Sequence, residues 1–132
     1  MTTILLIDDD TQLTGLLGEY LEQGGFRVVI ADDGERALGR IVDARADIVV
    51  LDIMMPKVDG LEVLRQIRAN PRTRITPVVM LTSSAEENDV LIAYDNGANS
   101  YVRKPVSMEE FFEVVRHLGL YWLLVNERPP RV

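Results

Sequence analysis

Short apolar runs recur along this chain at nearly even intervals, and this repetition constrains the fold more than any other feature. The runs lie near residues 4, 26, 47, 77 and 100. The segments between them carry apolar residues three and four positions apart, the spacing that is typical of one face of a helix. A strand-length run followed by a helical segment, repeated five times, predicts β and α units that alternate in a parallel sheet with right-handed crossovers.

The first and third runs are nearly continuous stretches of Ile, Leu and Val, not alternating apolar and polar residues. This pattern is typical of strands that helices cover on both faces, so we expect a doubly wound α/β fold. The helical spacing also predicts which side chains face the core. The predicted stripe of the first helix is Leu13, Leu16, Leu17, Tyr20 and Leu21, and that of the fourth is Val90, Ala93 and Tyr94.

Composition narrows the class of protein. The 132 residues fit one domain, and an apolar fraction of 47% is too high for a disordered chain. A net charge of −7 argues against direct nucleic-acid binding, which needs clustered positive charge. Cysteine is absent, which excludes disulfides and thiolate metal sites. Because no apolar run reaches the roughly 18 residues of a membrane span, we expect a soluble, cytoplasmic protein without membrane contact.

Charged residues stand where three of the apolar runs end. Asp8 and Asp9 follow the first run, Asp52 follows the third, and Lys104 follows the fifth. With the strand order 2-1-3-4-5, the first and third strands are neighbours, and their carboxylates emerge at the same edge of the sheet. Three carboxylates there would repel one another unless a cation lay between them. Lys104 can supply part of the compensating charge and a hard divalent metal the rest.

Four ordered motifs resemble the receiver domain of bacterial two-component response regulators. They are LLIDDD at residues 5–10, LDIMMP at 51–56 with Asp59 and Gly60, MLTS at 80–83, and GANSYVRKP at 97–105. The resemblance implies a flavodoxin-like (βα)5 fold. It also implies a signalling protein, not a metabolic enzyme, that takes a phosphoryl group from a sensor histidine kinase. We expect the receiver domain over residues 1–126, with an extended fifth helix, and a tail over residues 127–132.

The same resemblance implies roles for single residues. Asp52 would accept the phosphoryl group, and Lys104 and Thr82 would contact its oxygens. Thr82 and Tyr101 would form the switch that reports phosphorylation, and the peptide bond before Pro105 would be cis. The implied ligands of Mg²⁺ are Asp8, Asp9, Asp52 and the backbone carbonyl of Met54.

Alternative interpretations remain open from the sequence. Asp10 is expected to serve only at the start of a helix, and the same could hold for Asp8 and Asp9. Thr82 could be an ordinary strand residue. A Mg²⁺-dependent phosphohydrolase would need a second acid two positions after its aspartate nucleophile, where this chain has Met54. An interaction module without phosphorylation, or a flavin carrier on the same fold, is a third class.

Apolar residues beyond the needs of the core indicate self-association. We expect a homodimer through the fourth and fifth helices, against the alternative of a monomer with a covered tail. From about residue 70 onward the chain also resembles regulators associated with phytochromes, so the kinase partner could be of the phytochrome type. The first half is more similar to receivers that precede DNA-binding domains. The predicted interface residues are Leu91, Ile92, Tyr121, Trp122, Leu124 and Val125.

Overall fold

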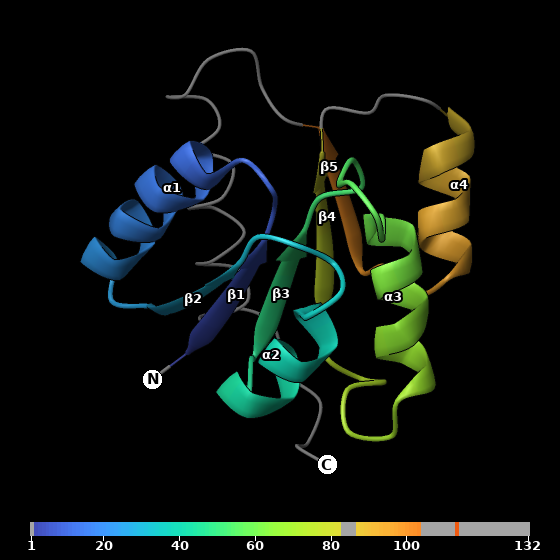
Figure 1. Ribbon diagram of the computed structural model, residues 1–132, viewed down its shortest axis with the longest axis horizontal. Coiled ribbons are helices and arrows are strands. Elements are labelled where there is room, and N and C mark those ends of the chain that lie inside the picture. Colours follow the sequence, from blue (N-terminus) through green and yellow to red (C-terminus); the bar gives the residue numbers. More distant parts are fainter. Residues whose placement is uncertain (1, 83–86, 104–112, 114–132) are drawn as a thin grey trace.

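The computed structural model describes residues 2–82, 87–103 and 113 (Figure 1). Within these residues, five parallel strands form one sheet in the order β2-β1-β3-β4-β5, and a helix follows each of the first four strands. The predicted α/β fold and strand order are therefore confirmed. The elements are β1 (Thr3–Ile7), α1 (Thr11–Gln23), β2 (Arg27–Ala31), α2 (Ala37–Ala44), β3 (Ile48–Leu51), α3 (Gly60–Ala69), β4 (Val78–Thr82), α4 (Glu87–Asp95) and β5 (Ser100–Arg103).

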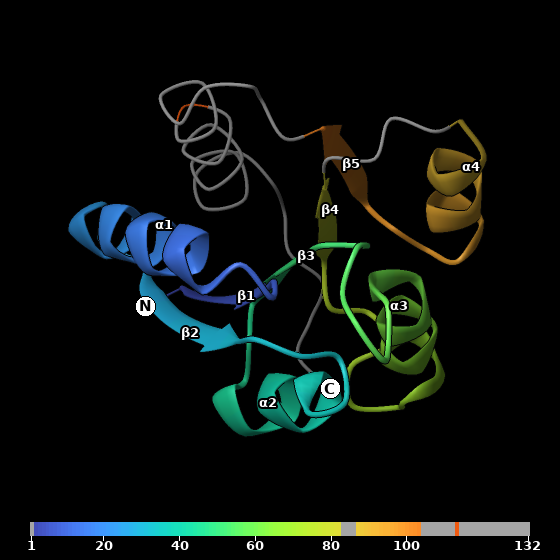
Figure 2. The same ribbon diagram turned by 45° about the horizontal axis from the view of Figure 1, so that its top comes forward.

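Two core clusters lie on opposite faces of the sheet. Helix α1 covers one face, and α2, α3 and α4 cover the other (Figure 2). Along β1, Leu5 and Ile7 belong to the cluster with α2 and α3, whereas Ile4 and Leu6 belong to the cluster with α1. Every residue of β1 is buried. Strand β1 is apolar from Ile4 to Ile7 because both of its faces are covered, as the sequence predicted.

Helix α1 presents a different face from the predicted one. Leu16 is 44% exposed, whereas Thr14 and Gly18 are buried beside Leu17 and Leu21. A Cβ built on Gly18 would lie only 3.4 Å from a methyl group of Val28 on β2. Gly18 therefore faces β2, where an added Cβ would be in van der Waals contact with Val28. Hydrophobicity alone ranks leucine above glycine, and for this reason the prediction for Leu16 was wrong.

Helix α4 touches the core through few of its residues. Ala93 is fully buried and Ile92 packs against the core, whereas Leu91 is 64% and Tyr94 is 50% exposed. The exposure of Leu91 agrees with the expectation that it exceeds the needs of the core, whereas Ile92 is partly buried against the core and Tyr94 is half exposed. That Leu91 and Ile92 form an interface stays a prediction. The side chains of successive helical residues point about 100° apart. When Ala93 contacts the core, the side chain of the next residue, Tyr94, therefore points away from it.

Arg68, in the last turn of α3, joins three segments at the amino-terminal edge of the sheet. Its Nε and one terminal nitrogen donate to the carbonyl oxygen of Gly97, at 3.0 and 2.7 Å. The other terminal nitrogen donates to the carbonyls of Arg74 and Thr76, at 3.0 and 2.7 Å. A fifth bond, of 3.0 Å, reaches Oδ1 of Asn99. All five N–H donors of a guanidinium are thereby used.

Several predictions concern parts of the chain outside the described residues. These are the fifth helix, the boundary between residues 1–126 and the tail at 127–132, the contacts of Lys104, the peptide bond before Pro105, and the interface residues Tyr121, Trp122, Leu124 and Val125. Of the helices that the structure describes, none is long and apolar enough to cross a membrane.

Candidate functional site

Strands β1 and β3 place two buried carboxylates side by side. The strands pair in parallel, with Ile7 opposite Leu51, so that Asp8 and Asp52 both begin the connections that leave the sheet at the same edge. Their backbones extend the ladder, because the Asp8 N–H donates to the Ala31 carbonyl at 3.1 Å and the Asp52 N–H donates to the Ile7 carbonyl at 3.0 Å. Asp8 is only 7% exposed and Asp52 only 5%.

Asp9 completes a cluster of three carboxylates. One oxygen from each of Asp8, Asp9 and Asp52 lies within 4.8 Å of the others. At this separation, two unit charges in a protein environment of effective dielectric constant ~20 repel by about 3 kcal/mol. Asp8 and Asp52 are both buried, so water and salt screen the repulsion between them only weakly. A group of hard oxygen donors at this spacing fits a divalent cation such as Mg²⁺, which would turn the repulsion into attraction.

Asp10 lies next to the cluster but has another role. Its Oδ1 accepts a hydrogen bond from the Leu13 N–H at 3.1 Å, so it caps the N-terminus of α1. Its own N–H donates to Oδ1 of Asp8 at 3.0 Å, which helps to orient that carboxylate. The prediction that Asp10 serves the helix start is confirmed.

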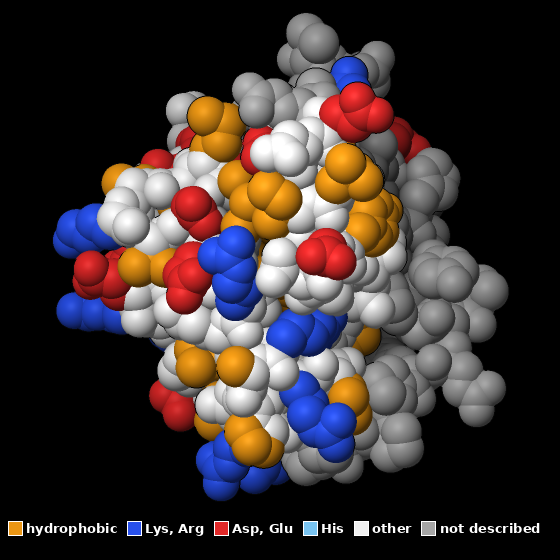
Figure 3. Space-filling model, turned by 90° about the vertical axis from the view of Figure 1, so that its right-hand side faces the viewer, with side chains coloured by type: hydrophobic (Ala, Val, Ile, Leu, Met, Phe, Trp, Pro, Cys, Tyr) orange, Lys and Arg blue, Asp and Glu red, His pale blue; other side chains and the backbone are white. Residues whose placement is uncertain are grey.

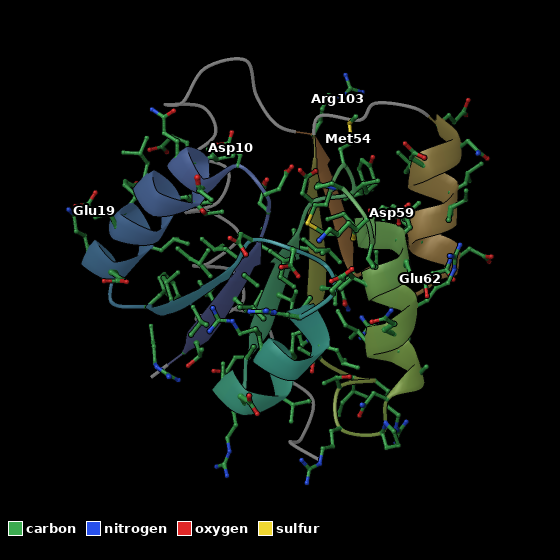
Figure 4. All side chains as sticks on the ribbon, in the orientation of Figure 1. Asp10, Glu19, Met54, Asp59, Glu62 and Arg103 are labelled. Atoms are coloured by element: carbon green, nitrogen blue, oxygen red, sulfur yellow. The ribbon has the colours of Figure 1, made fainter. Side chains whose placement is uncertain are left out.

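The connection between β3 and α3 folds back tightly against Asp52. The Met54 N–H donates to Oδ1 of Asp52 at 3.3 Å, and the Gly60 N–H donates to the Ile53 carbonyl at 3.0 Å. A Cβ on Gly60 would overlap the carbonyl oxygen of Asp52, so this close return of the chain requires glycine. Asp59 then caps α3 through a 3.0 Å bond from the Glu62 N–H. The Met54 side chain is 62% exposed at the edge where the strands end (Figure 4).

The other predicted site residues lie on β4 and β5. Thr82 ends β4 and pairs with Arg103, the last residue of β5, so both backbones reach the edge that carries the carboxylates. Lys104 would follow directly. Tyr101 is half-buried and packs against the core cluster on the side of α2, α3 and α4, as a strand aromatic would. The described residues therefore bring together Asp8, Asp9, Asp52 and Met54, with Tyr101 set back in the core.

Sequence reasoning missed one residue beside the site. Gly34, which follows β2, is buried, and its backbone lies directly against Val58 in the connection between β3 and α3. The available signal was the pair Asp33 and Gly34 at the end of a strand, a turn pattern that marks the same edge of the sheet.

The response regulator receiver domain is a protein family whose model matches residues 4–116 of this chain. The chain belongs to this family. The prediction drawn from the four motifs is thereby confirmed, and the receiver is a phospho-accepting signalling domain of a two-component response regulator. Receiver domains take phosphoryl groups from sensor histidine kinases.

Curated relatives and solved structures agree with this assignment. The receiver is 43% identical over 116 residues to the transcriptional regulatory protein CpxR of Escherichia coli K12, which covers 88% of the chain and 48% of CpxR. The chain thus spans about half the length of the curated relatives it matches first. It is 29% identical to the response regulator Rcp1, solved in its Mn²⁺-bound form, with a TM-score of 0.88 over 98% of the chain and 100% of Rcp1. The phosphorylated cyanobacterial phytochrome response regulator RcpA gives 29% identity and a TM-score of 0.90, over 98% and 99% of the two chains.

Proposed function

We propose that Asp52 takes a phosphoryl group from the phosphohistidine of a sensor kinase, in a reaction that depends on Mg²⁺. The observation that carries this proposal is the approach of three carboxylates to within 4.8 Å, with Asp52 buried among them. An isolated acid at a loop start needs no such neighbours. The receiver family and the phosphorylated form of RcpA support the choice of phosphoryl transfer.

The chemistry at Asp52 is a displacement at phosphorus. A carboxylate oxygen forms the new P–O bond while the P–N bond to histidine breaks, and the electron pair of that bond returns to the imidazole. The Met54 N–H bonded to Oδ1 restricts rotation of the carboxylate, so that attack comes from a fixed direction. Burial at 5% exposure excludes most water from the acceptor. These features position the nucleophile, and the other groups of the site stabilise the charge that develops on the phosphoryl oxygens.

The oxygen ligands of Mg²⁺ would be Asp8, Asp9, Asp52 and the backbone carbonyl of Met54. When bound, Mg²⁺ would offset two of the three carboxylate charges and draw charge from the phosphoryl oxygens. Lys104 would contact a second phosphoryl oxygen, preceding a cis bond at Pro105. The Mn²⁺-bound form of Rcp1 supports a divalent ion at such a site.

Asp8→Asn is expected to weaken Mg²⁺ binding by about tenfold to a hundredfold, because one anionic ligand is lost from the cluster. The Mg²⁺ concentration that half-saturates labelling by a small acyl phosphate should rise by the same factor. Calorimetric titration and the labelling rate measure the two effects.

Asp10→Asn is the matched control for this experiment. It removes the same charge two positions further along the chain, outside the cluster, and asparagine caps helices as well as aspartate does. Its metal affinity should stay within about threefold of that of the unchanged receiver, the margin expected of a screened surface charge. Equal losses in the two variants would show that net charge, not coordination by Asp8, controls binding.

The proposed readout runs through Thr82 and Tyr101. A hydroxyl of Thr82 drawn toward the new phosphoryl group would vacate space that the Tyr101 ring could fill. Tyr101 is half-buried against the core next to α4. A change in the position of its ring would therefore alter the surface formed by α4, β5 and the fifth helix. A coupling of this kind is worth about 1–3 kcal/mol, so phosphorylation would shift populations and not impose a rigid switch.

This surface would serve for homodimerisation or partner binding. Hydrophobic side chains gather over α4 in the upper part of one face, where Leu91 and Tyr94 are exposed (Figure 3). The proposed interface also includes Ile92 on α4, and its remaining residues would belong to the extended fifth helix within residues 1–126, ahead of the tail at 127–132. The likeness to RcpA supports a kinase partner of the phytochrome type.

Leu91→Asp is expected to weaken self-association by about tenfold or more, because a charge would be buried at the proposed interface. Sedimentation equilibrium with Mg²⁺ and a phosphoryl mimic measures the effect. Leu16→Asp provides the comparison, since Leu16 is also exposed but lies on α1, on the opposite face of the sheet. Self-association that is insensitive to Leu91→Asp would exclude α4 from the interface.

A further inference from the structure

We propose that Gly34, in the connection between β2 and α2, is a positioning residue for the acceptor loop, by which we mean residues 53–59. The inference rests on the proposed function, because it assigns Gly34 the task of holding the Met54 backbone in place for the metal. Gly34 itself touches neither the carboxylate cluster nor Met54. It acts through Val58, at the far end of the same loop.

The contact between Gly34 and Val58 leaves no room for a side chain. A Cβ on Gly34 would overlap the carbonyl oxygen of Val58, and would lie 3.0 Å from Val58 Cβ and 3.1 Å from a methyl group of Val63. Gly34 has no left-handed backbone conformation, unlike Gly25 and Gly97. Glycine is therefore required here for space and not for its φ angle.

Gly34 can hold Val58 in position because the turn that contains Gly34 is itself fixed. The Arg36 N–H donates to Oδ1 of Asp33 at 3.0 Å, which closes a turn around Gly34. The turn leads directly into α2, whose first residue, Ala37, is fully buried in the core. A side chain added at Gly34 would therefore displace Val58 more readily than it would displace this turn.

The acceptor loop has little freedom to absorb such a displacement. Lys57 is in the left-handed region, with a φ of 67°, and the Val58 N–H donates to the Pro56 carbonyl at 2.9 Å. The Met55 N–H donates to the Ile53 carbonyl at 3.0 Å, and the Gly60 N–H bonds the same oxygen. With both ends of the loop held, a shift at Val58 passes along the backbone to Met54.

Met54 is where such a shift would matter. Its N–H holds the Asp52 carboxylate through a 3.3 Å bond, which is already longer than the usual 2.9 Å of an N–H···O bond. Its carbonyl is a proposed metal ligand. Displacement of Met54 would leave the charge of every ligand unchanged, but it would move the proposed carbonyl ligand and loosen the Asp52 carboxylate. We therefore expect metal affinity to fall, and the labelling rate at saturating Mg²⁺ to fall with it.

Gly34→Ala tests this inference against Gly39→Ala. Gly39 lies in α2, and a Cβ there would meet nothing within 4 Å, so the control adds the same methyl group in open space. We expect Gly34→Ala to raise the Mg²⁺ dissociation constant about tenfold, as loss of a supporting contact around a metal site does, and Gly39→Ala to leave it unchanged. In the absence of metal, amide hydrogen exchange at residues 54–58 should also become faster in Gly34→Ala only.

The outcomes separate a positioning role from a structural one. A general loss of stability would lower the free energy of unfolding in urea and the fraction of labelled protein, with the half-saturating Mg²⁺ concentration unchanged, and that result would overturn the inference. So would equal metal affinity in the two glycine variants, provided that the unchanged receiver binds Mg²⁺. If the unchanged receiver does not respond to Mg²⁺, the proposed function fails and Gly34 loses the assigned task with it.

Val58→Gly gives a second test that does not depend on the folding of Gly34→Ala. It removes the Val58 Cβ, one of the two Val58 atoms that face Gly34, and so loosens the contact without adding bulk. Weaker Mg²⁺ binding would support the positioning role. Unchanged Mg²⁺ binding in Val58→Gly would contradict it.

Discussion

Asp52→Asn is expected to abolish Mg²⁺-dependent labelling of the receiver by a small acyl phosphate. Asparagine has nearly the shape of aspartate, but its amide is not a nucleophile toward phosphorus and cannot form the acyl phosphate. Loss of label to background, measured by mass spectrometry of the intact protein, is the largest effect that the proposed function predicts. The variant should also be at least as stable as the unchanged protein without metal, because it removes one of three mutually repelling charges.

Asp59→Asn is the control for the acceptor. Asp59 caps α3 after the same loop, and asparagine can accept the Glu62 N–H in its place. Labelling should therefore persist in Asp59→Asn, and the label should be cleaved by hydroxylamine, as expected of an acyl phosphate. A hydroxylamine-sensitive label that persists in Asp52→Asn would show that another carboxylate is the acceptor.

Arg68→Met is expected to lower the free energy of unfolding by about 2–3 kcal/mol. Five hydrogen bonds from a charged donor are lost, and the acceptors on residues 74, 76, 97 and 99 must find water instead. A hydrogen bond to a charged group is worth about 1.5–3 kcal/mol, but these bonds share one side chain, and solvent replaces part of them. Urea unfolding measures the loss.

Arg65→Met is the matched variant on the same helix. Arg65 makes one ion pair with Glu62, at 3.0 Å, between side chains that are 51% and 47% exposed. Such a pair contributes at most about 0.5 kcal/mol. Equal destabilisation by the two substitutions would show that the contacts of Arg68 at the edge of the sheet are unimportant for stability.

The difference between the two arginine variants should not depend on pH near neutrality. Burial lowers the pKa of Arg68, because desolvation disfavours its charged form. When the pKa of a base is lower in the folded than in the unfolded protein, protonation of the base lowers the free energy of unfolding. This loss is constant at any pH at which the side chain is protonated in both states. Arginine is protonated in both states throughout the neutral range. A difference that changes between mildly acidic and mildly alkaline buffer would point to another titrating group.

Much of the site could be predicted because its carboxylates directly follow the ends of neighbouring strands. Asp8 and Asp52 each follow a continuous apolar run, and a parallel sheet brings the ends of neighbouring strands to one edge. The helix cap at Asp10 and the turn before Gly60 are also local patterns, readable within a few residues. The alternation of strands and helices predicts a doubly wound parallel sheet, for which two strand orders are common, and the family resemblance implies the flavodoxin-like order 2-1-3-4-5.

The sequence by itself determined which segments form strands and helices, and at which edge the carboxylates gather, because these properties depend on the periodicity of neighbouring residues. The tertiary structure alone decided that Gly18 and not Leu16 faces the sheet, that Ile92 packs against the core, and that Gly34 lies against Val58. Each of these contacts joins segments far apart in the chain, and its geometry depends on distances of a few tenths of an ångström. At that scale, side-chain volume and backbone position decide which residues are in contact, and a hydrophobic pattern carries no information about either.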